Sequence, residues 1–129
     1  MKALDTPVLL ALLQGAPTAK ALLKSLSGEE LATTEANMLE LSALAARSDS
    51  RTSRIRALER LRRRLTVLPI DPQAVVEVTG RRSGDRAGSM LVWAMYGALQ
   101  TRGCAELITD TRGTLPGGRW RFKVRRVRL

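Results

Sequence analysis

The chain has 129 residues, a formal net charge of +10 and a sequence pI of about 11.3, with no histidine and one cysteine, Cys104. This length suits a single domain over residues 1–129, and one cysteine excludes an internal disulfide and a thiolate zinc site; we expect a cytoplasmic protein with no membrane span. Without histidine, any bound metal would be held mainly by carboxylates, which favours Mg²⁺ or Mn²⁺.

The first expected element is a short buried strand over residues 2–4, followed by Asp5 and a helix over residues 6–14. Thr6 is expected to cap this helix, and Pro7 suits its first turn because proline has no N–H to leave unpaired. A carboxylate after a first strand lies where open α/β sheets place ligand and metal chemistry. The simpler alternative is that Asp5 only caps the helix.

The rest of the chain alternates between helical and strand patterns. Helices are expected over 18–26, 35–47, 52–64, 72–79 and 89–102, and strands over 31–33, 65–70, 106–109 and 120–127. This alternation predicts a three-layer α/β/α sandwich, in which helices cover both faces of a mostly parallel sheet of about five strands. The last strand is basic at alternate positions, which suits a sheet edge with one face in water.

The charge is distributed unevenly along the chain. Residues 1–46 carry three basic and five acidic residues, a net charge of −2, whereas residues 47–129 carry 19 basic and seven acidic residues, a net charge of +12. Such a basic chain is expected to bind a polyanion, most simply nucleic acid, and the early acids favour a nuclease over a pure RNA-binding protein. Alternatively, the arginines only keep the surface soluble or meet an acidic protein.

Two further acids are expected to accompany Asp5. Glu40 lies in the helix over residues 35–47 beside small and apolar residues, where a buried acid is costly unless it is paired or bound to metal. The alternative is an ordinary surface glutamate on a helix edge. Asp110 follows the strand over residues 106–109, and because parallel strands end at one edge of a sheet, Asp5 and Asp110 should face the same crevice.

Three segments, in this order, resemble the motifs of PIN-domain nucleases: Leu4-Asp5-Thr6, Thr34-Glu35-Ala36-Asn37-Met38-Leu39-Glu40-Leu41 and Gly103-Cys104-Ala105-Glu106-Leu107-Ile108-Thr109-Asp110. Many small members of this family are the toxins of VapC-type toxin–antitoxin pairs. The resemblance covers nearly the whole chain and implies a parallel five-stranded sheet and Mg²⁺- or Mn²⁺-dependent cleavage of RNA. It also implies an antitoxin partner and a homodimer, for which the leucine-rich early helices would supply the interface.

The resemblance also assigns roles to particular residues. It implies that Asp5 and Glu40 are the first two metal ligands and catalytic acids, and that Thr6 is the hydroxyl beside them. Asp110 is the third candidate and Asp85, in the glycine-containing loop over residues 80–88, is the fourth.

The sequence departs from the usual family pattern at two places. The family usually has an acid near the positions of Leu91 and Val92, which are apolar here, and the nearest acid is Asp85. The last motif of the family usually reads Thr-x-Asp, whereas this chain reads Thr109-Asp110-Thr111. These departures keep a second reading open, in which a catalytically degenerate PIN-like domain binds RNA or protein.

Arginines near the expected site are candidates for holding the substrate: Arg81, Arg82, Arg86 and Arg112. A second basic cluster, in the helix over residues 52–64, is expected to contact phosphate or an acidic antitoxin segment: Arg60, Arg62, Arg63 and Arg64. A third reading of the whole chain is a small basic RNA-binding protein of ribosomal type, in which all the acids are structural.

Overall fold

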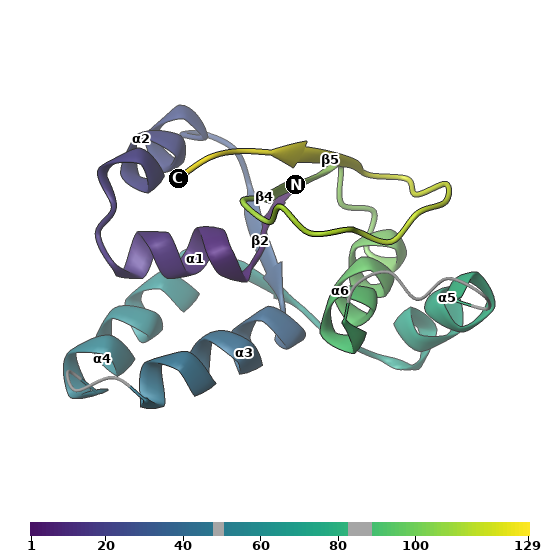
Figure 1. The fold of residues 1–129 in the computed structure, drawn as a ribbon, viewed down its shortest axis with the longest axis horizontal. Coiled ribbons are helices and arrows are strands. Elements are labelled where there is room, and N and C mark those ends of the chain that lie inside the picture. The colour runs from purple at the N-terminus through teal and green to yellow at the C-terminus, as the bar shows by residue number, and fades with distance from the viewer. Residues whose placement is uncertain (48–50, 83–88) are drawn as a thin grey trace.

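The computed structural model describes residues 1–47, 51–82 and 89–129, which form five strands and six helices (Figure 1). The strands are β1 (Lys2–Leu4), β2 (Leu31–Thr34), β3 (Thr66–Leu68), β4 (Glu106–Thr109) and β5 (Lys123–Arg126). The helices are α1 (Thr6–Leu13), α2 (Pro17–Ser25), α3 (Glu35–Ala46), α4 (Arg51–Arg62), α5 (Pro72–Arg82) and α6 (Met90–Thr101). The expected order of elements is confirmed.

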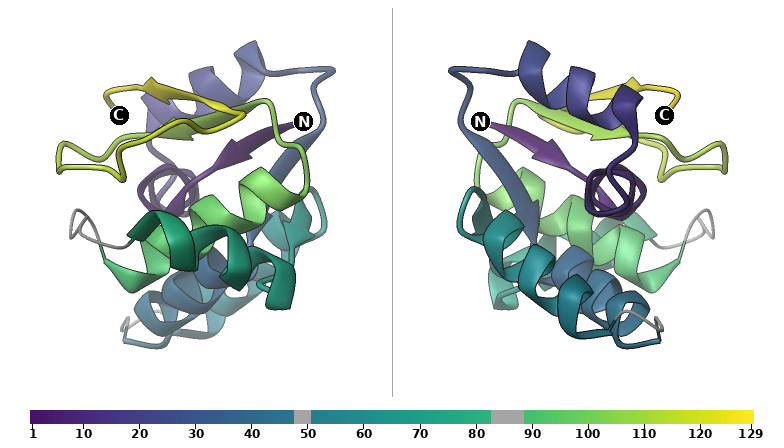
Figure 2. Two further views of the ribbon diagram at one scale, coloured as in Figure 1. Left: turned by 90° about the vertical axis from the view of Figure 1, so that its right-hand side faces the viewer. Right: turned by 90° about the vertical axis from the view of Figure 1, so that its left-hand side faces the viewer.

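All five strands are parallel, in the order β3-β2-β1-β4-β5. Ala3 at the centre of β1 lies opposite Ala32 of β2 and Leu107 of β4. β5 occupies one edge of the sheet, as its alternating basic residues predict (Figure 2). Because every pairing is parallel, β1, β2 and β4 end at the same edge, and the loops that follow them lie close together.

Helices cover both faces of the sheet, so the expected three-layer α/β fold is confirmed. Successive residues of a strand point to opposite faces. Ala3 therefore joins the core beneath α5 and α6, and Leu4 joins the core beneath α1, α3 and α4. In the neighbouring strand β4, Leu107 lies in the same core as Ala3, and Ile108 lies in the same core as Leu4. Figure 1 shows the sheet between these two groups of helices.

The first two helices differ slightly from expectation. α2 begins at Pro17, one residue before the expected start at residue 18, and its N-cap residue, Ala16, provides no side-chain hydrogen bond. Among the described residues no single helix is long and apolar enough to cross a membrane. Only α1 and α2 taken together meet that requirement of length and composition, and they are bent by 115° relative to each other.

Helix α5 is longer than expected and packs closely on α6. It continues through Gly80 to Arg82, and the ion pair between Glu77 and Arg81, at 3.8 Å, spans the glycine. Gly97 of α6 permits the close approach, since a methyl group there would lie 2.4 Å from the carbonyl oxygen of Ala74. The absence of a side chain at Gly97 therefore sets how closely α5 and α6 can pack.

We expect Gly97→Ala to lower the free energy of unfolding by about 1–3 kcal/mol, because the added methyl overpacks the contact with Ala74. This loss should outweigh the better helix propensity of alanine. Gly80→Ala is the matched control, since a methyl there meets nothing within 4 Å and should raise stability by up to about 1 kcal/mol. Urea denaturation measures both; a Gly97→Ala variant as stable as Gly80→Ala would contradict the close packing.

Candidate functional site

A pocket of about 280 Å³ opens at the edge where β1, β2 and β4 end. We call it the acidic pocket. The residue before α1 and the helices α1 and α3 together contribute four of its polar lining residues: Asp5, Thr6, Asn37 and Glu40. The start of α6 and the loop after β4 complete its walls. The motifs at Asp5 and Glu40, 35 positions apart in the chain, thus border one cavity.

Asp5 both caps α1 and lines the acidic pocket. Its Oδ1 accepts a hydrogen bond from the backbone N–H of Val8 at 3.5 Å, so Asp5 and not Thr6 is the cap, and that expectation for Thr6 was wrong. Burial raises the pKa of Asp5 to about 6, while hydrogen bonds from Thr109 and Val8 oppose this rise. The charges of Asp110 and Glu40 also contribute to this raised pKa.

Thr6 cannot serve as the cap because its hydroxyl is used elsewhere. The hydroxyl donates to Glu40 Oε1 at 2.5 Å and accepts from Asn37 Nδ2 at 3.2 Å. Glu40 is half-buried and fixed by this bond, so it is not a free surface glutamate. Asn37 was not among the predicted site residues, although its position three residues after Thr34 is typical of a helix-capping pair.

Asp110 follows β4 at the same sheet edge as Asp5, and its charge acts on Asp5, but it does not line the acidic pocket. The pocket wall there is formed by the next residue, Thr111, at the position where the family usually has an acid. Within residues 1–47, 51–82 and 89–129, no three acidic or cysteine side chains are close enough to hold one metal ion.

The wall provided by α6 is mainly apolar. Ser89 caps the helix, with its hydroxyl 3.3 Å from the backbone nitrogen of Val92, and Leu91 and Val92 face the pocket. These two residues occupy the place where the family usually has its third acid. Asp85 and Arg86, two of the predicted site residues, lie outside the described residues, and the side chain of Arg82 is likewise not described.

The predicted substrate arginines that the structure describes have different surroundings. The guanidinium of Arg81 lies 4.5 Å from the centre of the Trp120 ring and donates to the carbonyl oxygen of Arg119. Arg112 is exposed and follows Thr111 on the rim of the acidic pocket. Of these two arginines, Arg112 is therefore closer in sequence to the predicted acid Asp110, and its side chain is the more exposed to a ligand.

Arg126 is a residue that the sequence analysis missed. Its guanidinium donates to the carbonyl oxygens of Thr111 at 2.8 Å and Gly113 at 3.2 Å. It thereby fixes the loop that closes one side of the acidic pocket. The register between β4 and β5, which places Arg126 opposite Thr109, brings it there, and no sequence pattern shows that register directly.

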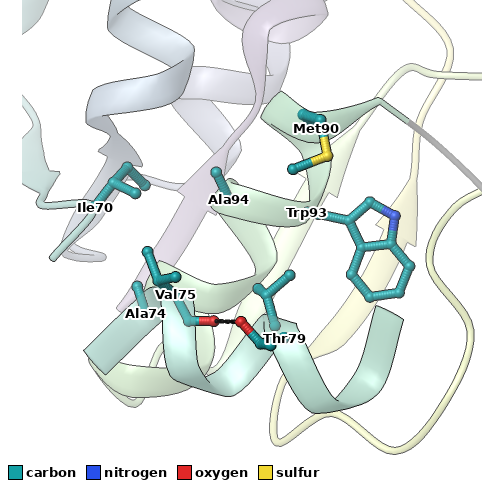
Figure 3. A pocket seen from close by; sticks show the side chains of 8 residues that line it. Ile70, Ala74, Val75, Thr79, Met90, Trp93 and Ala94 are labelled. Atoms are coloured by element: carbon teal, nitrogen blue, oxygen red, sulfur yellow. Dashed lines mark hydrogen bonds between the residues drawn. The ribbon is translucent and has the colours of Figure 1, made fainter. Parts of the chain in front are cut away.

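A second pocket lies on the other side of α6, between α5 and α6 (Figure 3). It has a volume of about 370 Å³, and none of its described lining residues is acidic. Its lining is almost entirely apolar, and Thr79 directs its hydroxyl to the carbonyl oxygen of Val75 at 2.8 Å. Trp93 and Ala94 of α6 line this pocket, whereas Leu91, Val92 and Met95 line the acidic one. Helix α6 therefore separates the two.

A family model described as PIN domain matches residues 2–109 of the chain. The chain belongs to the PIN-domain family. The resemblance inferred from the three motifs is thereby confirmed. The match includes β1, α1, α3 and the start of α6, whereas the loop after β4, which forms another wall of the acidic pocket, lies beyond residue 109. No curated protein matches the sequence.

Solved structures of VapBC and VapC proteins share the fold of this PIN domain. VapBC2 from Rickettsia felis, bound to a promoter DNA fragment, has 12% identity and a TM-score of 0.75, covering 85% of this chain and 86% of that one. VapBC from Salmonella typhimurium, also bound to DNA, has 19% identity and a TM-score of 0.74, covering 84% and 85%. Mycobacterium tuberculosis VapC20, a toxin that cleaves the Sarcin-Ricin loop, has 18% identity and a TM-score of 0.67, covering 83% and 87%.

The donor atoms of the acidic pocket suit a hard divalent cation. Asp5 and Glu40 offer carboxylate oxygens, and Thr6 and Thr111 offer hydroxyl oxygens beside them. Mg²⁺ commonly binds proteins through one or two carboxylates and completes its coordination with water and substrate phosphate. The residues of this PIN domain therefore fit such an ion, with fewer acids than the usual family pattern.

The raised pKa of Asp5 predicts that Asp5→Asn stabilises the protein at neutral pH in the absence of metal. The folded pKa of about 6 exceeds the ordinary value of 3.8, so folding is favoured by protonation and wild-type stability falls as the pH rises from about 4 to 6. Asparagine keeps the capping oxygen but carries no charge. The gain should be largest above pH 7, up to about 3 kcal/mol, and absent below pH 4.

Thermal unfolding in chelator across pH 4–8 measures this difference. Asp71→Asn provides a matched control, because Asp71 also caps a helix but the Ala74 backbone N–H and Arg102 hold the pKa of its carboxyl below the usual range. The control should therefore lose stability where Asp5→Asn gains it. A gain for Asp5→Asn that is equal at every pH would contradict burial of the Asp5 charge.

Proposed function

We propose that this PIN domain is a cytoplasmic endoribonuclease of the VapC toxin type that works with Mg²⁺ or Mn²⁺. The observation that carries the proposal is that Asp5 and Glu40, from distant parts of the chain, border one pocket and act electrostatically on each other. Their proximity is costly without a cation, because like charges in a partly buried site repel each other. The shared fold with VapC20, a Sarcin-Ricin loop cleaving toxin, supports RNA as the substrate.

In this proposal the side chains at and near the acidic pocket have different roles. A divalent cation held by Asp5 and Glu40 would supply an activated water and charge to offset that of the phosphate. Thr6 orients Glu40 through the 2.5 Å hydrogen bond. Arg112, which is exposed and follows Thr111 in the chain, would hold a neighbouring phosphate of the RNA. Asp110 and Asp85 remain the predicted additional acids, and Arg81, Arg82 and Arg86 the predicted additional substrate contacts.

A second candidate function is RNA or protein binding by a catalytically degenerate PIN domain. Two observations favour it: Leu91 and Val92 line the acidic pocket where the family usually has an acid, and Thr111 stands at another such place. In that case Asp5 and Glu40 would be too few to hold the cation at physiological concentration. The two candidates differ in whether Mn²⁺ binds and whether RNA is cut.

Cleavage of RNA in Mn²⁺ tests the leading proposal. We expect the purified protein to cut an RNA oligonucleotide carrying the Sarcin-Ricin loop or another structured RNA, and excess chelator to stop the reaction. Asp5→Asn and Glu40→Gln should each lower kcat about 100-fold or more, since each removes a cation ligand. Glu59→Gln is the control, because Glu59 is exposed on α4 and forms an ion pair with its helix neighbour Arg62.

The outcomes separate the two candidates. Cleavage that persists in chelator, or Mn²⁺ binding by calorimetry that Asp5→Asn leaves unchanged, would contradict the nuclease proposal. RNA binding without any Mn²⁺ binding would support the degenerate domain instead.

We propose an antitoxin as protein partner, docked in a groove of about 400 Å³ formed by α1, α2 and α4. The groove has an apolar floor and a basic rim, and we call it the basic groove; its lining includes Leu12, Leu13, Leu23, Leu61, Lys20, Arg60 and Arg64. An amphipathic segment with acidic residues would complement both parts. The VapBC complexes with the same fold support such a partner.

We propose that a homodimer forms through the face of α5 and the start of α6 rather than through the early helices. Val75, Val76 and Met90 there are 54%, 72% and 60% exposed, although all three are large and apolar. No residue of α1 or α2 is among the strongly exposed large apolar side chains of the described chain. An exposed apolar patch of this kind is typical of a protein interface.

Analytical ultracentrifugation tests both surfaces with one pair of variants. Val76→Glu should convert the dimer to a monomer, because it places a charge in the apolar interface, and should leave binding of the partner encoded beside this gene within about threefold. The double variant Arg60→Glu/Arg64→Glu should remain a dimer, but its affinity for the partner should fall about tenfold or more. A wild-type protein that stays monomeric at high concentration would contradict the dimer.

A further inference from the structure

A chain of hydrogen bonds runs from the start of α3 to Glu40. The backbone N–H and the hydroxyl of Thr34 donate to Asn37 Oδ1 at 3.3 and 2.6 Å. Asn37 Nδ2 donates to the hydroxyl of Thr6 at 3.2 Å, and that hydroxyl donates to Glu40 Oε1 at 2.5 Å. We call these four residues the Asn37 relay. It connects the capping pair of α3 with the acidic pocket and links α1 to α3.

The direction of every bond in the relay is determined by its donors and acceptors. Thr34 presents two donors, so the carbonyl oxygen of Asn37 must face Thr34 and the amide NH₂ must face Thr6. The hydroxyl oxygen of Thr6 then accepts a hydrogen bond from the Asn37 amide, and its own hydrogen is directed to Glu40. The remaining amide proton of Asn37 points to Met95 Sδ at 3.4 Å.

Burial makes the relay resistant to rearrangement. Thr34, Asn37 and Thr6 are 0%, 5% and 6% exposed, so a broken bond would leave a polar group without water to replace its partner. The anchor of the relay is also part of the backbone structure, because Thr34 and Asn37 form the capping box of α3. Glu40 is carried by that same helix, one turn beyond Asn37.

We propose that Asn37 is a positioning residue for Glu40 that acts through Thr6; this rests on the proposed metal-dependent nuclease function. Asn37 holds the hydroxyl of Thr6 in the donor orientation, and Thr6 engages Oε1 of Glu40, which leaves Oε2 for the cation. Two carboxylates line the pocket among the residues that the structure describes, and a site held by so few acids depends strongly on the orientation of each. Asn37 thereby compensates for acids that the usual family pattern would supply.

A double-mutant cycle on Mn²⁺ affinity, measured by calorimetry without RNA, tests the relay. Asn37→Leu and Thr6→Val each keep the shape but remove the bond to the next member, and each should raise the Kd for Mn²⁺ about tenfold. The double variant should also lose about tenfold rather than a hundredfold, because both changes interrupt one pathway. Thr6→Ser restores the hydroxyl and should recover most of the affinity lost in Thr6→Val.

Ser42→Ala is the control on the same helix, since Ser42 is exposed and its hydroxyl donates to the carbonyl oxygen of Met38, outside the relay. It should leave the Kd for Mn²⁺ unchanged. Losses that multiply in the double variant, or an Asn37→Leu variant with wild-type affinity, would overturn the relay. If the wild-type protein binds Mn²⁺ and Asp5→Asn abolishes that binding, either of these results contradicts the relay but leaves the proposed function standing. If the wild-type protein binds no Mn²⁺, the proposed function fails and the relay fails with it.

Asn37→Leu also removes an acceptor from Thr34 and needs a check of folding by thermal unfolding. If that variant does not fold, hydrogen exchange of the Asn37 side-chain amide replaces it. The Nδ2 proton that faces Thr6 should exchange about tenfold faster in Thr6→Val than in Thr6→Ser, because only serine retains the accepting hydroxyl. Equal exchange rates in these two variants would overturn the relay.

Discussion

The parallel pairing of β1 with β2 and β4 is the constraint on which the acidic pocket depends. β1 has three residues, yet it pairs on both sides, and the hydroxyl of Thr33 adds a bond to the carbonyl oxygen of Leu4 at 2.9 Å. This pairing brings Asp5, the start of α3 and the loop after β4 to one edge. A slip of one residue would exchange Ala3 and Leu4 between the two cores and displace Asp5 from the pocket.

Asp5 combines two roles that the sequence presented as alternatives. Its carboxylate caps α1, and the same carboxylate lines the pocket, where burial and two nearby acids make its charge costly. Because Asp5 takes the cap, the hydroxyl of Thr6 is free to bind Glu40. The local structure of the first helix and the chemistry of the pocket therefore share one arrangement of three side chains.

The fold was predictable because its signals are local: apolar runs of strand length, helical periodicity, and capping or breaking residues at most boundaries. That Asp5 and Glu40 could border one pocket was predictable for the same reason, since one follows a strand and the other lies on a helix beside small and apolar residues. The bond from Thr6 to Glu40 spans 34 positions and depends on how closely α1 approaches α3, which no local pattern encodes. Likewise, the role of Arg126 follows only from the register of β5 on β4.

An anomalous difference map from a crystal soaked in Mn²⁺ tests the central claim most directly. We expect one strong peak in the acidic pocket, between the carboxylates of Asp5 and Glu40, with Thr6 still hydrogen-bonded to Glu40. A map in which these two carboxylates point to opposite sides of the molecule, or in which manganese binds only elsewhere, would contradict it.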